Sequence, residues 1–297
     1  MEINESIINY RRHLKRRNYS ANTVKNYLNI LKRFALWLNV PLQEADRRTI
    51  SAYIDYLQDR RLEAKTINCH LTAVRCFYTY LKDEGELNII NPVGRGRSLR
   101  LGQPLPKHLR DQEVATLFNT IKSRRDLAMF MLMLRCGLRV AEVAGLTLDA
   151  ADLKRSRLYV NNGKGGKDRV VYLSRDAAYV LSAYLQVRRP LIKTKSVFLV
   201  EKSLCRGKPI SVRGIQKRIE HYANECGLDV SCHQLRHTMA TQLLNADADL
   251  VTIQDLLGHT RIKTTQRYCR VSNLKVQKDY LKAIESVMSK MVRGPTA

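Results

Sequence analysis

A basic segment rich in proline and glycine divides the sequence into two parts of different texture. Residues 91–107, NPVGRGRSLRLGQPLPK, contain three prolines, three glycines, four basic residues and no acidic residue. This composition disfavours helices and strands and predicts an extended linker. The chain of 297 residues is also long for one hydrophobic core. We therefore expect one domain at residues 1–88, a linker at 89–107 and a second domain at 108–297.

The part before the linker has the apolar periodicity of amphipathic helices. Apolar residues recur three and four positions apart over residues 4–38, where Ser20 is a suitable N-cap between two helices. The same periodicity marks residues 49–61 and 64–84. Four helices in so short a stretch predict a small helical bundle.

The part after the linker mixes helical segments with two β-like runs. The runs RLYVNN (157–162) and RVVYLS (169–174) are rich in Val and Tyr and flank the glycine-rich turn GKGGKD (163–168). The predicted helices begin near Asp111, fill residues 124–145 as two helices that meet near Cys136 and Gly137, and continue over 176–189, 211–226, 233–245, 249–257, 264–270 and 273–291. The sequence therefore predicts a mainly α protein with a small β-sheet.

Charge gives the clearest indication of a partner. The chain has 52 Lys and Arg against 27 Asp and Glu, for a net charge of +25. Residues 1–107 contribute +9 and the remainder +16, so that neither part alone accounts for the charge. Two basic domains can hold a nucleic acid duplex from two sides. A soluble basic protein, or one that binds ribosomes or membrane surfaces, remains the alternative, and the linker cations are either phosphate contacts or solvated.

Several other classes of protein are not expected. No apolar run reaches the length of a membrane span, and MEINESIINY lacks the apolar core of a signal peptide, which favours a cytoplasmic protein. The seven cysteines form no CxxC pair, so no metal site is expected. The GKGGKD turn is not a P-loop, because it lacks the required spacing and joins two β-like runs. We expect neither ATP nor any other cofactor.

Five short motifs contain residues that suit phosphate chemistry, although each has an ordinary structural interpretation when taken alone. Arg139 in RCGLRVAEVAGL can be a surface arginine paired with Glu142, and lysines on a hairpin turn are usually solvated. His–Arg pairs on a helix are commonly surface features, a histidine after a helix can interact with the helix end, and most tyrosines are packing residues. The motif residues are Arg139, Lys164 and Lys167 of the turn, His233 and Arg236 of HQLRH, His259 after Gly258, and Tyr268 of TTQRYCR.

Taken in order, these motifs resemble the tyrosine recombinase family, which includes phage integrases and the Xer-type resolvases of chromosome dimers. CGLRVAE, the GKGGK hairpin, HQLRHTMAT and LLGHTRIKTTQRY follow in the order of the family, and Tyr268 stands nine residues after His259. Cys136 and Ala141 depart from the Thr and Ser that relatives often have. The resemblance implies an N-terminal four-helix core-binding (SAM-like) domain and a mixed α/β catalytic domain.

The resemblance also implies a role for each motif residue. Arg139 and Arg236 clamp the scissile phosphate, because guanidinium groups offer paired donors and stay charged. His259 donates a further hydrogen bond to the same phosphate. Tyr268 is the nucleophile that forms a 3′-phosphotyrosyl intermediate, with His233 as its base. Lys164 is expected to protonate the leaving 5′-oxygen, with Lys167 as the alternative.

Expected partners follow from the same resemblance. The protein is expected to bind a double-stranded DNA core site as a tetramer on two sites, with the helix 273–291 docked on a neighbouring protomer or packed on its own domain. Candidate DNA contacts in the N-terminal domain are Lys25, Lys32, Arg33, Lys65 and Arg75. An accessory protein or a second recombinase is a further candidate partner. The length leaves little room for an arm-binding domain, which favours a simple recombinase acting on short core sites.

Two alternative functions remain open on the sequence alone. One is a DNA-binding accessory protein without strand exchange, and the other is a type IB topoisomerase that only relaxes supercoils. The sequence identifies neither the target site nor the biological role, which can be dimer resolution, phage integration or transposition.

Overall fold

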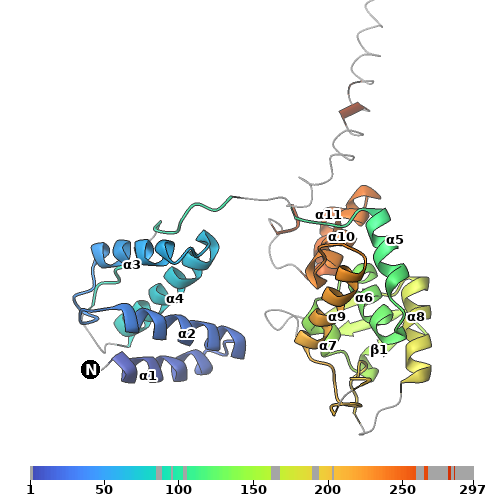
Figure 1. The fold of residues 1–297 in the computed structure, drawn as a ribbon, viewed down its shortest axis with the longest axis horizontal. Helices are drawn as coiled ribbons and strands as arrows, with labels where there is room; N and C mark the ends of the chain where they lie inside the picture. Colours follow the sequence, from blue (N-terminus) through green and yellow to red (C-terminus); the bar gives the residue numbers. More distant parts are fainter. Residues whose placement is uncertain are drawn as a thin grey trace, which may run out of the picture. The chain divides into compact units, whose positions relative to one another are not determined.

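The computed structural model divides the chain into two compact units, Met1–Gln103 and Pro104–Ala297 (Figure 1). The structure describes residues 3–84, 89–94, 96–102, 106–161, 168–188, 194–202, 204–258, 264–266, 280, 281 and 284. Both units are dominated by helices, and the second also contains a three-stranded sheet, which confirms the prediction of a mainly α protein with a small β-sheet.

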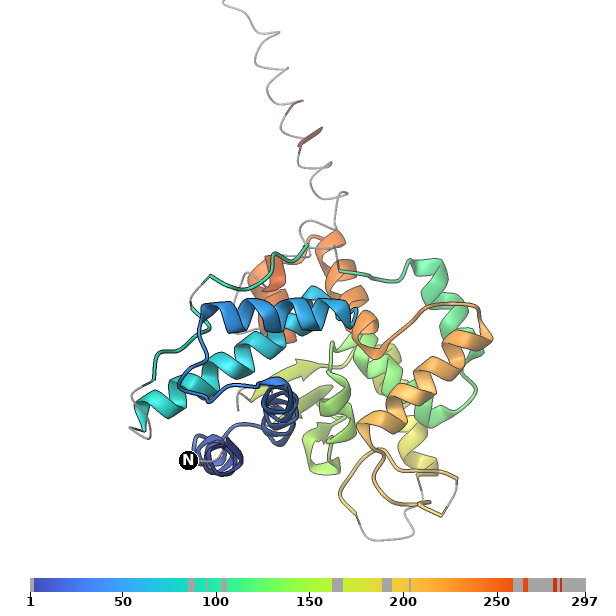
Figure 2. The ribbon, with the colours of Figure 1, turned by 60° about the vertical axis from the view of Figure 1, so that its left-hand side comes forward.

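The first unit is built from four amphipathic helices. Their bounds are α1 (Ile3–Arg16), α2 (Ala21–Trp37), α3 (Arg47–Asp59) and α4 (Ala64–Asp83). The predicted cap Ser20 accepts a hydrogen bond from the Thr23 amide, and Asp46 caps α3 in the same way through Thr49. In Figure 2 the axes of α1 and α2 point toward the viewer while α3 and α4 run across the view, so that two helical pairs cross steeply.

Aromatic side chains fill the core between these helices. Phe34 of α2 lies edge-on against Tyr53 of α3, with ring centroids 4.9 Å apart, and both rings are fully buried. The Tyr53 hydroxyl shares a 2.8 Å hydrogen bond with Nδ1 of buried His70 on α4. The Tyr78 hydroxyl donates to the Leu42 carbonyl at 3.1 Å. These bonds satisfy the polar ends of the rings, so that their large apolar surfaces can be buried without penalty.

The proline- and glycine-rich segment has no helix or strand where it is described, and α4 holds its backbone. The Asn68 amide donates to the Leu99 carbonyl at 3.0 Å and accepts from the Leu99 amide at 2.8 Å. Arg75 donates to the carbonyls of Val93 and Gly94 at 3.2 and 3.4 Å. Arg75, one of the candidate DNA contacts, is thus engaged in fixing this segment to the first unit.

The second unit surrounds the apolar helix α6. Figure 1 shows α6 in the middle of the unit, and its contacts with α8 and α10 are extensive. The helices are α5 (Asp111–Thr120), α6 (Arg124–Arg135), α7 (Val140–Ala144), the 3₁₀ turn η1 (Leu148–Ala150), α8 (Arg175–Val187), α9 (Val212–Glu225), α10 (Cys232–Asn245) and α11 (Leu250–Leu257).

The sheet of this unit has the order β1-β2-β3 and is antiparallel throughout. Its strands are β1 (Ala151–Asp152), β2 (Arg157–Val160) and β3 (Arg169–Tyr172). In the β2–β3 register Leu158 faces Val171, and both side chains are fully buried. The sequence predicted β2 and β3 but not β1, because a two-residue strand after a 3₁₀ turn leaves no periodic signal. Lys164 and Lys167 of the connecting turn lie outside the described residues.

The structure describes only part of the two helices predicted at the C-terminus, residues 264–270 and 273–291. Residues 264–266 are helical, as are positions 280, 281 and 284 within the predicted helix 273–291. The remaining residues of the two predicted segments 264–270 and 273–291, including Tyr268, lie outside the described part, and so does His259. Within the described ranges, no helix has both the length and the apolarity needed to cross a membrane.

Burial separates four of the described cysteines into two reactivity classes. Burial raises the pKa of the Cys136 thiol to about 12, and that of Cys232 to about 11. Cys69 and Cys205 are exposed. We predict that iodoacetamide at pH 8 labels Cys69 and Cys205 in the native protein, and Cys136 and Cys232 only after unfolding, because the thiolate is the reactive form. Peptide mass spectrometry checks this, and native labelling of Cys136 at the rate of Cys205 contradicts the fold.

Candidate active site

The break between α6 and α7 brings Arg139 to the start of a helix. Gly137 adopts the left-handed region with φ +64°. A Cβ atom at this position would lie 3.0 Å from Leu257 Cδ2 and 3.1 Å from Met239 Sδ. Both the backbone conformation and the close approach of α10 and α11 therefore require glycine. Arg139 follows as the N-cap of α7.

Arg139 is bound on two sides by groups of the second unit. Its backbone amide donates to Glu142 Oε2 and its Nη1 to Glu142 Oε1, both at 2.7 Å. Its Nη2 donates to the Gly258 carbonyl at 3.0 Å. The pairing with Glu142 considered from the sequence is present, but the side chain is only 23% exposed. Protein groups therefore fix the guanidinium of Arg139, while part of the side chain stays exposed.

Arg236 is the most deeply buried charged group of the described motifs. Its exposed fraction is 1%, and it donates hydrogen bonds to the carbonyls of Gly137 and Leu257. A surface His–Arg pair, the ordinary interpretation of HQLRH, is therefore wrong for the arginine. His233 is exposed on the same helix, and its ring contacts that of His237 with centroids 4.2 Å apart.

The C-terminal end of α11 is the point where three arginines meet. Gly258 ends the helix in the left-handed conformation, with φ 59° and ψ 50°, which glycine commonly adopts at a helix C-terminus. The carbonyl of Leu256 accepts from Arg169 Nε at 2.9 Å, that of Leu257 from Arg236, and that of Gly258 from Arg139. Carbonyls at a helix end lack intrahelical partners and carry partial negative charge, so cations stabilise them.

Glu142 forms ion pairs with two of these arginines, Arg139 and Arg169. The carboxylate is bound by Arg169 through Nη1 and Nη2, each at 2.8 Å, in addition to its two bonds from Arg139. Burial by itself raises the pKa of Glu142, but the hydrogen bonds and charges of Arg169 and Arg139 outweigh it and lower the pKa to about 2. Glu142 is therefore ionised at neutral pH and organises both guanidinium groups.

The structure brings Arg139 and Arg236 together and places His233 on the same helix as Arg236. Lys164, Lys167, His259 and Tyr268 lie outside the described residues. The carbonyl partners of the two arginines are neighbours in the chain, Leu257 and Gly258, and His259 is the next residue. Sequence reasoning did not single out Arg169. An arginine that opens a predicted strand has no pattern that distinguishes it from a solvated one.

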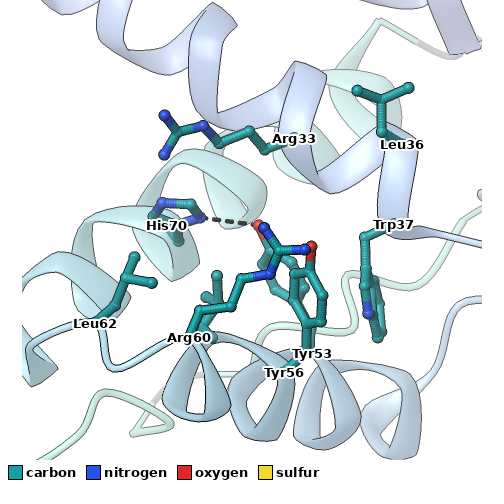
Figure 3. Close-up of a pocket in the computed structure, with 9 residues that line it drawn as sticks. Arg33, Leu36, Trp37, Tyr53, Tyr56, Arg60, Leu62 and His70 are labelled. Atoms are coloured by element: carbon teal, nitrogen blue, oxygen red, sulfur yellow. Dashed lines mark hydrogen bonds between the residues drawn. The ribbon is translucent and has the colours of Figure 1, made fainter.

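The first unit contains a separate basic pocket of about 750 Å³ (Figure 3). The Arg60 guanidinium lies over the Tyr56 ring, 4.6 Å from its centroid, and Arg33 lines the opposite side from α2. Burial, and then the charge of Arg33, lower the pKa of His70, so this histidine is neutral at neutral pH. Arg33 also lines a second pocket between α2 and α4. This face offers guanidinium, amide and hydroxyl donors, and Arg33 is one of the predicted DNA contacts.

Comparison with protein families gives matches over both units. Residues 107–275 match the Phage integrase family, and residues 7–85 match the Phage integrase, N-terminal SAM-like domain.

Individual relatives agree with these matches. The chain is 32% identical to the tyrosine recombinase XerC of Staphylococcus haemolyticus over 277 residues, covering 90% of this chain and 92% of the relative. It is 30% identical to the tyrosine recombinase XerA of Thermococcus kodakarensis, covering 97% and 99%. Among solved structures, the Tn1549 transposon integrase in complex with circular intermediate DNA has a similar fold, with a TM-score of 0.74, 19% identity and coverage of 90% and 95%.

The contacts of Glu142 predict that the free energy of unfolding falls at acidic pH. Because its folded pKa of about 2 lies below the ordinary 4.5, ionised Glu142 contributes stability that is complete above pH 4.5 and lost as the pH falls toward 2. The contribution is on the order of 3 kcal/mol. We predict that Glu142→Gln lowers the free energy of unfolding by a constant amount from pH 8 to 5, and by less below that, as urea unfolding measures.

A matched control for this variant lies at the start of α5. Glu113 forms the same arrangement with Arg110, accepting from its backbone amide at 2.8 Å and its side chain at 3.1 Å. Arg110 is 82% exposed, however, so the pair is screened by solvent. Glu113→Gln is expected to cost much less. Equal losses for Glu142→Gln and Glu113→Gln would show that the buried contacts of Glu142 add nothing.

Proposed function

This chain belongs to the phage integrase family of site-specific tyrosine recombinases, and we propose that it breaks and rejoins DNA strands through the hydroxyl group of Tyr268. The observation that carries the proposal is the convergence of Arg139 and Arg236 on successive carbonyls immediately before His259. The relatives named above are recombinases, which favours strand exchange over an accessory DNA-binding role or simple relaxation.

Arg139 and Arg236 are proposed to bind the non-bridging oxygens of the scissile phosphate. Attack on a phosphodiester builds negative charge on these oxygens, and donors that are already oriented stabilise it without reorganisation. Two observations support this role: the carbonyl contacts fix both guanidinium groups, and Arg139 is partly exposed. His259 follows Gly258 directly and is proposed to donate to the same phosphate.

Tyr268 is proposed to attack the phosphorus atom while the bond to the 5′-oxygen breaks. His233 accepts the phenol proton, a role that its exposed position on α10 permits. Lys164 donates a proton to the leaving 5′-oxygen, with Lys167 as the alternative. The 3′-phosphotyrosyl bond retains the free energy of the phosphodiester, so that a 5′-hydroxyl of a partner duplex can reverse the step and join the strands.

The protein is proposed to act on a double-stranded core site that both units contact. The first unit contributes exposed cations on α2 and α4, namely Lys25, Lys32, Arg33 and Lys65. Phosphate contacts of this kind fix the register and orientation of a protein on DNA. For exchange between two sites, the protein is proposed to form a tetramer. An accessory protein or a second recombinase is a further candidate partner.

A suicide substrate tests the nucleophile. A nick close to the scissile phosphate makes the released fragment, which carries the 5′-hydroxyl, short enough to diffuse away. Without this hydroxyl the strand cannot be resealed, so the covalent intermediate accumulates. With nicked DNA from the genetic neighbourhood of the protein, we expect a denaturant-resistant protein–DNA adduct for the wild type and none for Tyr268→Phe, because phenylalanine lacks the attacking oxygen. Denaturing gel electrophoresis measures the adduct, and binding assays on the same DNA serve as the control. An adduct of equal yield with Tyr268→Phe would assign the nucleophile to another residue.

A further inference from the structure

We propose that Arg169 is a positioning residue for strand cleavage, which holds the phosphate-binding Arg139 and the turn before His259 in one fixed arrangement. This inference rests on the proposed function, because it concerns how the same site is assembled. Arg169 belongs to β3 and directly follows the GKGGKD turn, but it is not one of the residues that the motifs singled out.

The guanidinium of Arg169 connects two segments that carry site residues. Its Nε donates to the Leu256 carbonyl at 2.9 Å, at the end of α11. Its Nη1 and Nη2 donate to the two oxygens of Glu142 at 2.8 Å each. All three nitrogens are thus bound to protein groups, and the side chain is only 10% exposed. A guanidinium used in this way acts through its neighbours rather than on DNA.

Glu142 transmits the position of Arg169 to Arg139. Each carboxylate oxygen accepts one bond from Arg169 and one from Arg139, with distances between 2.7 and 2.8 Å. The carboxylate is 7% exposed, so these bonds are little weakened by water. When Arg169 is lost, Glu142 loses the partner that fixes its plane, and Arg139 loses a fixed acceptor.

Arg169 also packs against the turn that precedes His259. A Cβ atom on Gly258 would lie 3.0 Å from Arg169 Cδ, so the arginine stem closely covers this glycine. Arg169 opens β3, opposite Val160 in the register. The base of the hairpin that contains Lys164 and Lys167 in its sequence is therefore joined to the end of α11.

Arg125 offers a control that matches Arg169 in burial and bonding. It is 8% exposed, donates to Asp126 at 2.8 and 2.6 Å, and donates to the Leu199 carbonyl at 3.0 Å. Arg125 also forms an ion pair with Glu201 at 3.8 Å. Arg125→Gln and Arg169→Gln therefore each remove a buried arginine that donates hydrogen bonds to one carboxylate and one carbonyl. Thermal unfolding of both variants defines a temperature at which each is folded, and cleavage is compared there.

The test measures the rate of adduct formation on two nicked substrates. One has the natural scissile phosphate, and the other has a methylphosphonate, in which a methyl group replaces one charged oxygen. On the phosphate we expect Arg169→Gln to react about 10²-fold more slowly than the wild type, the loss typical of a misplaced catalytic group. On the neutral substrate the loss should shrink to about tenfold or less, because less charge needs stabilisation. Arg125→Gln should match the wild type on both.

Three results would overturn the proposal. If Arg169→Gln cleaves at the wild-type rate while the wild-type adduct depends on Tyr268, Arg169 does not position the site and the proposed function stands. Equal losses on both substrates, shared by Arg125→Gln, would assign Arg169 a purely structural role. If the wild type forms no Tyr268-dependent adduct on DNA that it binds, the proposed function fails and this inference fails with it.

Discussion

Three successive carbonyls at the end of α11 each accept a hydrogen bond from a different arginine, and the arrangement of the candidate site depends on these bonds. Arg169 belongs to β3 and Arg236 to α10, and Arg139 is the N-cap residue of α7. A helix C-terminus attracts cations because its last carbonyls are unpaired and its dipole is negative there. Segments remote in sequence are therefore brought together by a feature of the backbone, and the turn before His259 becomes their common point.

This arrangement holds three guanidinium groups close together at the end of α11 in the absence of DNA. Arg139 and Arg169 share the Glu142 carboxylate, whose pKa their charges and hydrogen bonds lower to about 2 despite its burial. Arg236 is buried and directed by the carbonyls of Gly137 and Leu257. Donors that are oriented before the substrate arrives need no reorganisation when phosphate charge develops, which is the condition for effective electrostatic catalysis.

Local patterns predicted much of this structure, and tertiary contacts account for what they missed. The helices, the Ser20 cap and the end of α11 at Gly258 follow from periodicity and capping preferences. The short strand β1 and the role of Arg169 do not, because each is defined by partners distant in the chain. The order of motifs indicated Arg236, but its burial could not be predicted, since HQLRH alone is equally compatible with a solvated helix face.

Arginine contacts fix the end of α11 before DNA binds. Amide hydrogen exchange over residues 250–258, without DNA, tests this most directly in the wild type and in Arg236→Lys. A lysine ammonium cannot span the carbonyls of Gly137 and Leu257 as the planar guanidinium does. The account predicts faster exchange at the last turn of α11 in the variant, with α8 unchanged as an internal reference. Identical exchange in both proteins would show that the helix end holds its position without the arginine, and would contradict the account.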